Sequence, residues 1–171
     1  MLAAPAGSNT RPTADRAKEG LFNIIAPQIS GTRFLDIFCG SGAIGIEALS
    51  RGAKEAVFIE NAAPAIKAVK ENLTKTKLQN AEIIEVSAEK AINMLSGAGR
   101  TFDIIFLDPP YDSHIIPKTL QEIYRAGLLD PNGVIIAETE ANPQTEVPGF
   151  FLNSVRVCGH ANFLFYNLVR G

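Results

Sequence analysis

The sequence predicts an α/β fold with a mostly parallel sheet of seven strands and helices on both of its faces. Short apolar runs alternate with helical patterns through most of the chain. Apolar strands joined by helical crossovers form parallel sheets that are covered on both sides. After residue 140, two strand patterns are separated only by Cys158 to Ala161, and so short a connection predicts an antiparallel hairpin at the C-terminal end.

Length and composition predict a single domain. The chain has 171 residues, of which 46% are hydrophobic and 20% charged, with a formal net charge of −2. This balance is typical of a globular domain. We expect an N-terminal arm over residues 1–13 and one domain over residues 14–171, acting as a monomer.

Several features predict a cytoplasmic protein that does not enter a membrane. No apolar run approaches the ~18 residues that a membrane span needs, and the first residues lack the pattern of a signal peptide. The two cysteines, Cys39 and Cys158, lie far apart in the chain. This spacing predicts reduced thiols, not a disulfide scaffold.

The first predicted element is a helix that begins at Thr13 and ends at Pro27. Thr13 is a favourable N-cap residue, an apolar stripe occupies residues 21–25, and proline disrupts a helix interior. The most basic short segment of the chain surrounds the start of this helix and contains Arg11, Arg16 and Lys18. Charge alone favours a solvated helix face here, because the chain as a whole is slightly acidic.

The remaining elements follow in alternation. Apolar runs predict strands at residues 33–38, 56–60, 82–86, 102–107 and 134–138, and then the hairpin strands at 151–157 and 162–169. Helical patterns predict a helix that Gly52 closes and helices over residues 64–73, 88–95 and 115–126. Gly127 is a favourable helix end, and residues 130–133 predict a turn.

Three features fall at the carboxyl ends of these strands, where open α/β sheets bind ligands. The first is the glycine-rich loop at residues 40–45, which reads G-x-G-x-x-G between a strand and a helix; glycine lets a ligand approach the backbone closely. The second is Glu60, about twenty residues beyond the loop, where an acid can bind both hydroxyls of a ribose. The third is Asp108-Pro109-Pro110-Tyr111.

The loop and Glu60 suit either a nicotinamide dinucleotide or S-adenosylmethionine. Asp36 lies inside the first strand, just before the loop. An acid there favours S-adenosylmethionine, which carries a sulfonium and an α-amino group, over a dinucleotide with its negative pyrophosphate. Hydrogen bonding of Asp36 to the loop amides is the structural alternative. His114 and His160 are predicted to lie at the surface and in the hairpin turn, and no residue spacing predicts a metal site.

The motif Asp108-Pro109-Pro110-Tyr111 suits a planar heterocycle that carries an exocyclic amine. Proline has no N–H to donate, so the strand ladder stops here. The Asp108 carboxylate and the Pro109 carbonyl can then accept the amine hydrogens while the base stacks on Tyr111. Taken alone, the motif also fits a purely structural role, in which it only ends the strand and begins a loop.

Taken together, these segments resemble the class I S-adenosylmethionine-dependent methyltransferases that act on exocyclic amines. The segment from Arg11 to Glu19, with Phe22-Asn23 behind it, is similar to the bacterial RsmD-type methylases, which modify the N2 amine of a guanine in 16S ribosomal RNA. The resemblance covers nearly the whole chain from about residue 9. Adenine-N6 methyltransferases of DNA or RNA share the D-P-P-Y motif and are the alternative.

The resemblance implies a Rossmann-like class I methyltransferase fold, S-adenosylmethionine as cofactor and ribosomal RNA in a small-subunit assembly particle as partner. The implied catalytic residues are Asp108, Pro109, Pro110 and Tyr111. The implied cofactor-binding residues are Asp36, Phe38, Gly40, Ser41, Gly42, Glu60, Asn61, Ser87, Ala88 and Asp108. The implied RNA-binding residues are Arg11, Thr13, Arg16 and Lys18.

The chain departs from the family pattern at two places. Members usually begin with a short basic strand that contains glycine, and little of it precedes the Arg-Pro-Thr segment here. After the third strand the family often has an acid at the adenine contact, whereas this chain has Ser87-Ala88-Glu89. Ser87 is therefore the expected partner of the adenine amine.

Overall fold

In the computed structural model, residues 12–110, 114–140 and 146–169 are described. The strands are β1 (Arg33–Ile37), β2 (Glu55–Ile59), β3 (Ala81–Ile84), β4 (Phe102–Leu107), β5 (Leu129–Thr139), β6 (Glu146–Val147), β7 (Phe150–Cys158) and β8 (Ala161–Leu168). The helices are α1 (Pro12–Ile29), α2 (Ala43–Ser50), α3 (Ala63–Thr76), α4 (Ala88–Gly97) and α5 (Ile115–Ala126).

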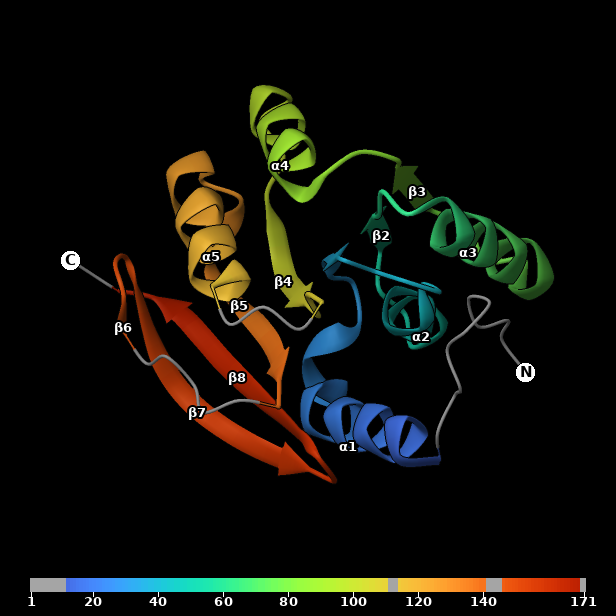
Figure 1. Cartoon of the computed structure of the whole chain (residues 1–171), viewed down its shortest axis with the longest axis horizontal. Helices are drawn as coiled ribbons and strands as arrows, with labels where there is room; N and C mark the ends of the chain where they lie inside the picture. The colour runs from blue at the N-terminus through green and yellow to red at the C-terminus, as the bar shows by residue number, and fades with distance from the viewer. Residues whose placement is uncertain (1–11, 111–113, 141–145, 170–171) are drawn as a thin grey trace.

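The strands form one sheet in the order β3-β2-β1-β4-β5-β8-β7-β6. Strands β1 to β5 pair in parallel, and β8 pairs antiparallel with both β5 and β7. Helices α4 and α5 cover one face of the sheet, while α1, α2 and α3 cover the other (Figure 1). The predicted architecture is therefore confirmed, including the antiparallel C-terminal hairpin.

Both predicted ends of α1 were wrong. The helix begins at Pro12, so Thr13 lies inside its first turn, and it continues through Pro27 to Ile29. Proline suits the first helical position because its fixed φ is helical and its missing N–H is not needed there. Pro27 removes only the hydrogen bond to the Asn23 carbonyl, and the complete burial of Ile29 holds the final residues in the helix.

The predicted turn at residues 130–133 does not precede β5 but forms a bulge within it. Only Asp103 of β4 stands opposite these residues, since the flanking pairs join Phe102 to Leu129 and Ile104 to Val134. The bulge has turn-like bonding, because the Asn132 N–H donates to Asp130 Oδ1 at 3.0 Å, a contact that aspartate favours in turns.

Two further differences concern the C-terminal strands. The short strand β6, which pairs with the start of β7, was not predicted, since two residues carry no periodic pattern. The hairpin turn is tighter than expected: Cys158 pairs with Ala161, leaving only Gly159 and His160 in the turn. Gly159 has a φ of 67°, which glycine adopts without strain at the first position of a type II′ turn.

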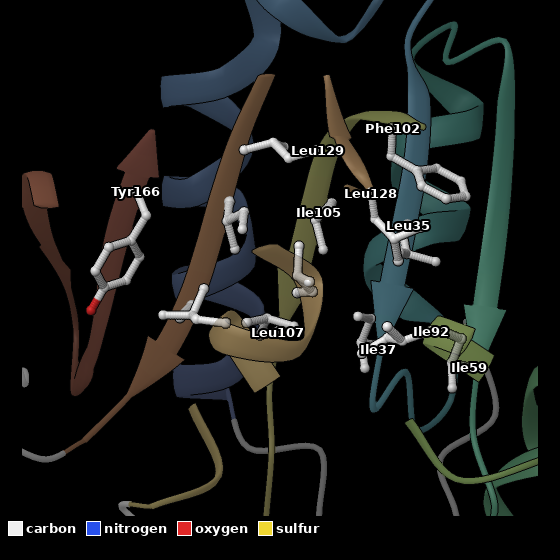
Figure 2. Packing of buried hydrophobic residues seen from close by; sticks show 14 of the residues in the cluster. Leu35, Ile37, Ile59, Ile92, Phe102, Ile105, Leu107, Leu128, Leu129 and Tyr166 are labelled. Carbon is white, nitrogen blue, oxygen red and sulfur yellow. The ribbon is translucent and has the colours of Figure 1, made fainter. Parts of the chain in front are cut away.

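Alternate residues of the central strands enter two separate cores. Ile105 and Leu107 of β4 pack under α4 and α5, in the cluster shown in Figure 2. Ile104 and Phe106 pack on the opposite side, under α1 and α2. This alternation decides which face each polar residue meets, and it places Asp36 of β1 on the α2 side, where its carboxylate meets α2.

Gly45 provides the close contact between α2 and β2. A Cβ at this position would overlap the ring edge of Phe58, with Cζ only 2.8 Å away. Gly97, at the end of α4, has no atom within 4 Å of the corresponding point. Glycine is thus required by packing at the first position and not at the second.

We therefore expect Gly45→Ala to lower the free energy of unfolding by about 1–3 kcal/mol, because the added methyl overpacks a rigid aromatic contact. Gly97→Ala is the matched control and should be neutral or stabilising by up to ~1 kcal/mol, since alanine is the better helix former. Urea denaturation of both variants measures the difference. Equal stabilities would contradict the packing role of Gly45.

Candidate active site

The order of the strands reverses between β1 and β4, and both strands end at the same edge of the sheet. The glycine-rich loop leaves β1 and the D-P-P-Y motif leaves β4. The two segments are joined at their start, because the Asp108 N–H donates to the Ile37 carbonyl at 3.4 Å. Such a reversal point opens a crevice in which α/β proteins bind ligands.

The glycine-rich loop has an unusual backbone. Phe38, Gly40 and Gly42 all have positive φ angles, of 63°, 55° and 76°. An aromatic residue in this region is strained, whereas glycine is not. A Cβ at Gly40 would meet no atom within 4 Å, but one at Gly42 would lie 2.5 Å from Val69 Cγ2. Gly42 therefore packs against α3, while Gly40 faces open space that a ligand can occupy.

Glu60 follows β2 directly and holds the loop in place. Its Oε2 accepts the Gly40 N–H at 3.0 Å, and its Oε1 accepts the N–H groups of Asn61 and Ala62 at 2.8 and 2.9 Å. Each carboxylate oxygen accepts about two hydrogen bonds. Oε2 thus retains acceptor capacity for a ribose hydroxyl beside the loop.

Asn72 is a second support of the loop, and the sequence analysis missed it. It lies in α3 and is completely buried. Its Nδ2 donates to the Ser41 carbonyl at 3.0 Å. A detectable signal was available: Asn72 is a polar residue at the helical spacing of the apolar residues Ala65 and Val69.

Asp36 is buried, with 1% of its surface exposed, and its Oδ2 accepts the Gly45 N–H at 2.9 Å. The structural alternative considered for this residue is thus present. Burial raises the pKa of Asp36 to about 8; the bond from Gly45 opposes the rise, and the charges of Asp108 and Glu60 add to it. A cation bound beside this carboxyl would stabilise its charged form.

Asp108 directly follows the carboxyl end of β4, at the strand reversal point. Its surface is exposed to solvent, yet protein atoms surround it closely enough to desolvate its carboxyl group. This desolvation, followed by the charge of Glu140, raises the pKa of Asp108 to about 6. Pro109 is half-buried and Pro110 exposed, and Tyr111 lies outside the described residues.

Glu138, at the end of β5, was not predicted as a site residue. Leu107 of β4 pairs with Ala137 of β5, so Asp108 and Glu138 are the next residues of neighbouring strands. Burial raises the pKa of Glu138 to about 8, and the charges of Asp108 and Glu140 contribute. The sequence could have identified Glu138 in the same way as Asp108, because both are acids at the end of an apolar strand.

The remaining predicted residues lie around this edge or on α1. Ser87 precedes α4, and its Oγ accepts the Lys90 N–H at 3.5 Å, so it caps the helix; Ala88 begins that helix. Arg16 is exposed on α1 and Lys18 is half-buried there. Arg11 lies outside the described residues, and Asn61 is exposed beside Glu60.

A separate cavity of about 340 Å³ lies at the opposite edge of the sheet, lined by the starts of β2 and β3 and by Arg100. The guanidinium of Arg100 is paired with Glu55 and Glu82, so its charge is already matched. Among residues 12–110, 114–140 and 146–169, no helix is long and apolar enough to cross a membrane and no cluster of His, Cys, Asp or Glu could hold a metal ion.

Comparison with known proteins agrees with this geometry. Residues 1–167 match the family described as conserved hypothetical protein 95. The chain belongs to this family, that of the RsmD-type proteins. It is 34% identical over 167 residues to ribosomal RNA small subunit methyltransferase D of Escherichia coli K12, covering 96% of this chain and 83% of the relative.

Two more similar proteins extend the comparison. The chain is 40% identical over 148 residues to a putative rRNA methyltransferase, YlbH, of Bacillus subtilis, covering 86% of this chain and 79% of YlbH. It superposes on the solved structure of the putative methyltransferase yhhF from Escherichia coli with a TM-score of 0.83 and 32% identity, covering 98% and 91% of the two chains. The fold is therefore that of a class I methyltransferase.

The raised pKa values predict a pH-dependent stability. Between the ordinary carboxyl pKa near ~4 and the raised values of about 8 for Asp36 and Glu138, the folded chain holds protons that the unfolded chain has released. The free energy of unfolding should therefore decrease as pH rises through this window.

Glu138→Gln should reduce this decrease in the free energy of unfolding between pH 5 and 8, by an amount on the order of 2 kcal/mol. Denaturation of the unliganded variant and of the wild-type chain at several pH values measures it. A variant slope equal to that of the wild type would show that Glu138 titrates normally in the folded chain.

Proposed function

We propose that this S-adenosylmethionine-dependent RNA methyltransferase modifies the N2 amine of a guanine in 16S ribosomal RNA. The observation that carries the proposal is the position of Asp108 and Pro109 at the strand reversal point, joined to the end of β1 and the cofactor loop. The name of the Escherichia coli relative supports a small-subunit substrate. We expect the chain to act as a monomer, in the cytoplasm, on RNA within an assembly particle.

The residues present fit the cofactor. Open space at Gly40 leaves the loop backbone accessible, and the group of carboxyls around Asp36 and Glu60 suits a cationic ligand. The loop from Asp36 to Gly42 would hold the methionine part, Glu60 the ribose, and Ser87 the adenine amine. When bound, S-adenosylmethionine supplies an electrophilic methyl group on its sulfonium.

Asp108 and the Pro109 carbonyl would make the target amine nucleophilic. An exocyclic amine is a weak nucleophile because its lone pair is delocalised into the ring. Acceptance of the two amine hydrogens favours a pyramidal nitrogen with a localised lone pair. Positive charge then develops on that nitrogen, and the nearby Asp108 carboxylate stabilises it. Alignment of the two reactants contributes the rest of the rate.

The product nitrogen must lose one proton after transfer. Asp108 need not be a strong base, because a protonated arylamine is acidic. Its pKa, raised to about 6, lets its carboxylate take that proton and release it to solvent near neutral pH.

The RNA must present an unstacked base to this site. Extrusion costs a few kcal/mol, and stacking on Tyr111 would offset part of the cost. Arg11, Arg16 and Lys18 would hold phosphates near the start of α1, with Thr13 beside them. Because such contacts release counterions, RNA binding should weaken as salt rises.

The reaction itself is tested by incubating the chain with S-adenosylmethionine and unmodified 16S RNA, small subunits or DNA. Nucleoside analysis by mass spectrometry should find N2-methylguanosine in the RNA. N6-methyladenosine in RNA or DNA, the alternative product of a D-P-P-Y enzyme, would overturn the proposal.

Asp108→Ala should lower the rate of methyl transfer by about 100-fold or more, since an electrostatic contact to the transition state is lost. Its affinity for S-adenosylhomocysteine, measured by calorimetry, should change little. Glu71→Ala, on the exposed side of α3, is the control and should retain full activity. Full turnover by the Asp108 variant would reject the mechanism.

Glu60→Ala should weaken S-adenosylhomocysteine binding by about tenfold or more, because a charged hydrogen bond to ribose is worth about 1.5–3 kcal/mol and the loop loses its tie at Gly40. Glu60→Gln keeps an oxygen for the Gly40 N–H and should show an intermediate affinity. Calorimetry that finds the alanine variant unchanged would remove Glu60 from the site.

A further inference from the structure

The D-P-P-Y motif does not by itself distinguish one exocyclic amine from another. We propose that Glu138 accepts the N1–H of the target base and so selects guanine over adenine. This inference rests on the proposed guanine-N2 activity and assigns its base specificity to a residue outside the motif.

The register of the sheet places Glu138 beside Asp108. Leu107 pairs with Ala137 in the parallel β4–β5 ladder, so the residues that follow leave strands about 4.8 Å apart. Glu138 also pairs with Phe163 of β8, and Phe163 packs in the core under α1 and α2. Glu138 therefore points to the same face of the sheet as Asp36.

The surroundings of Glu138 leave its carboxyl group available. The residue is half-buried, and its carboxyl group makes no hydrogen bond or ion pair with another residue of the described part of the chain. Its electrostatic neighbours are the acids Asp108 and Glu140, and its cross-strand partner Phe163 is apolar. A partly buried carboxyl without a hydrogen-bond donor is destabilising, and a donor on a bound base would relieve that cost.

The chemistry of the two bases explains the selection. An extruded base is read by hydrogen bonds along its Watson–Crick edge. In guanine the N2 amine lies next to the N1–H donor, whereas in adenine the N6 amine lies next to an N1 lone pair. With the amine on Asp108, the neighbouring Glu138 carboxylate meets a donor in guanine and a lone pair in adenine. Sites that leave a polar group unpaired reject the wrong substrate strongly.

Glu140 is the nearest alternative and fits less well. It is exposed and follows the end of β5 at Thr139, so its side chain is not fixed by the strand. It is the same residue type as Glu138, and its charge contributes to the raised pKa values of both Asp108 and Glu138. Glu140→Gln is therefore a matched control that removes a neighbouring charge but keeps the proposed contact.

The test replaces the target guanine by 2-aminopurine, which keeps the 2-amine but has a lone pair at N1. The methylated guanine is first located by mass spectrometry, and 16S RNA with either base at that position is then assembled by ligation. Assays at about pH 8.5 keep most of the Glu138 carboxyl ionised, given its pKa of about 8, so it has no proton to offer to that lone pair.

The wild-type chain should prefer guanine to 2-aminopurine by about 10- to 100-fold in kcat/KM, the range for one hydrogen bond to a charged group. Glu138→Ala and Glu138→Gln should bring this ratio close to one, and Glu140→Gln should keep it. Because 2-aminopurine also lacks O6, the decisive quantity is the change of the ratio between variants. Affinities of the two RNAs, measured with S-adenosylhomocysteine, should follow the same order without turnover.

The outcomes separate the two proposals. Guanine methylation by the wild-type chain with an unchanged ratio in both Glu138 variants would overturn the role of Glu138 and leave the guanine-N2 activity standing. If Glu140→Gln lowered the preference for guanine as much as the Glu138 variants do, the preference would depend on the local charge and not on a contact from Glu138. That result would also overturn the role of Glu138. A wild-type chain that methylates no guanine would reject the activity and the inference together.

Discussion

The parallel pairing of β1 with β4 is the constraint on which the rest of the site depends. It brings together two loops that lie about seventy residues apart in the chain and sends both out of the same sheet edge. The pairing continues one bond beyond the strand, from the Asp108 N–H to the Ile37 carbonyl. The glycine-rich loop and the D-P-P-Y motif therefore share one rigid support, and the proposed alignment of two reactants requires such a support.

A second property of this edge is its concentration of carboxyl groups. Asp36, Glu60, Asp108 and Glu138 come from the ends of four different strands, and the pKa values of three of them are raised mainly by burial. Such an arrangement is unfavourable in the empty chain, because like charges are brought together with little water. It suits a cationic sulfonium and an amine that becomes positive during the reaction.

Much of the candidate site was predictable from local sequence. The glycines at 40 and 42 with Glu60 and the D-P-P-Y motif are short patterns whose spacing has a direct structural meaning. Asn72 and Glu138 were missed because their roles come from partners distant in sequence: Asn72 meets the loop only when α3 packs on it. The C-terminal end of α1 was misjudged because burial of Ile29 outweighs the break expected at Pro27.

The sequence by itself determined the α/β class, the parallel strands, the hairpin and the RsmD-type resemblance, since these depend on periodicity and on contiguous motifs. Only the tertiary structure decided the bulge in β5, the added strand β6 and the position of Glu138 beside Asp108. Those features arise from strand order and register, which join residues far apart in the chain. A short connection identifies the two strands of a hairpin as neighbours, but local preferences do not show which of the other strands pair.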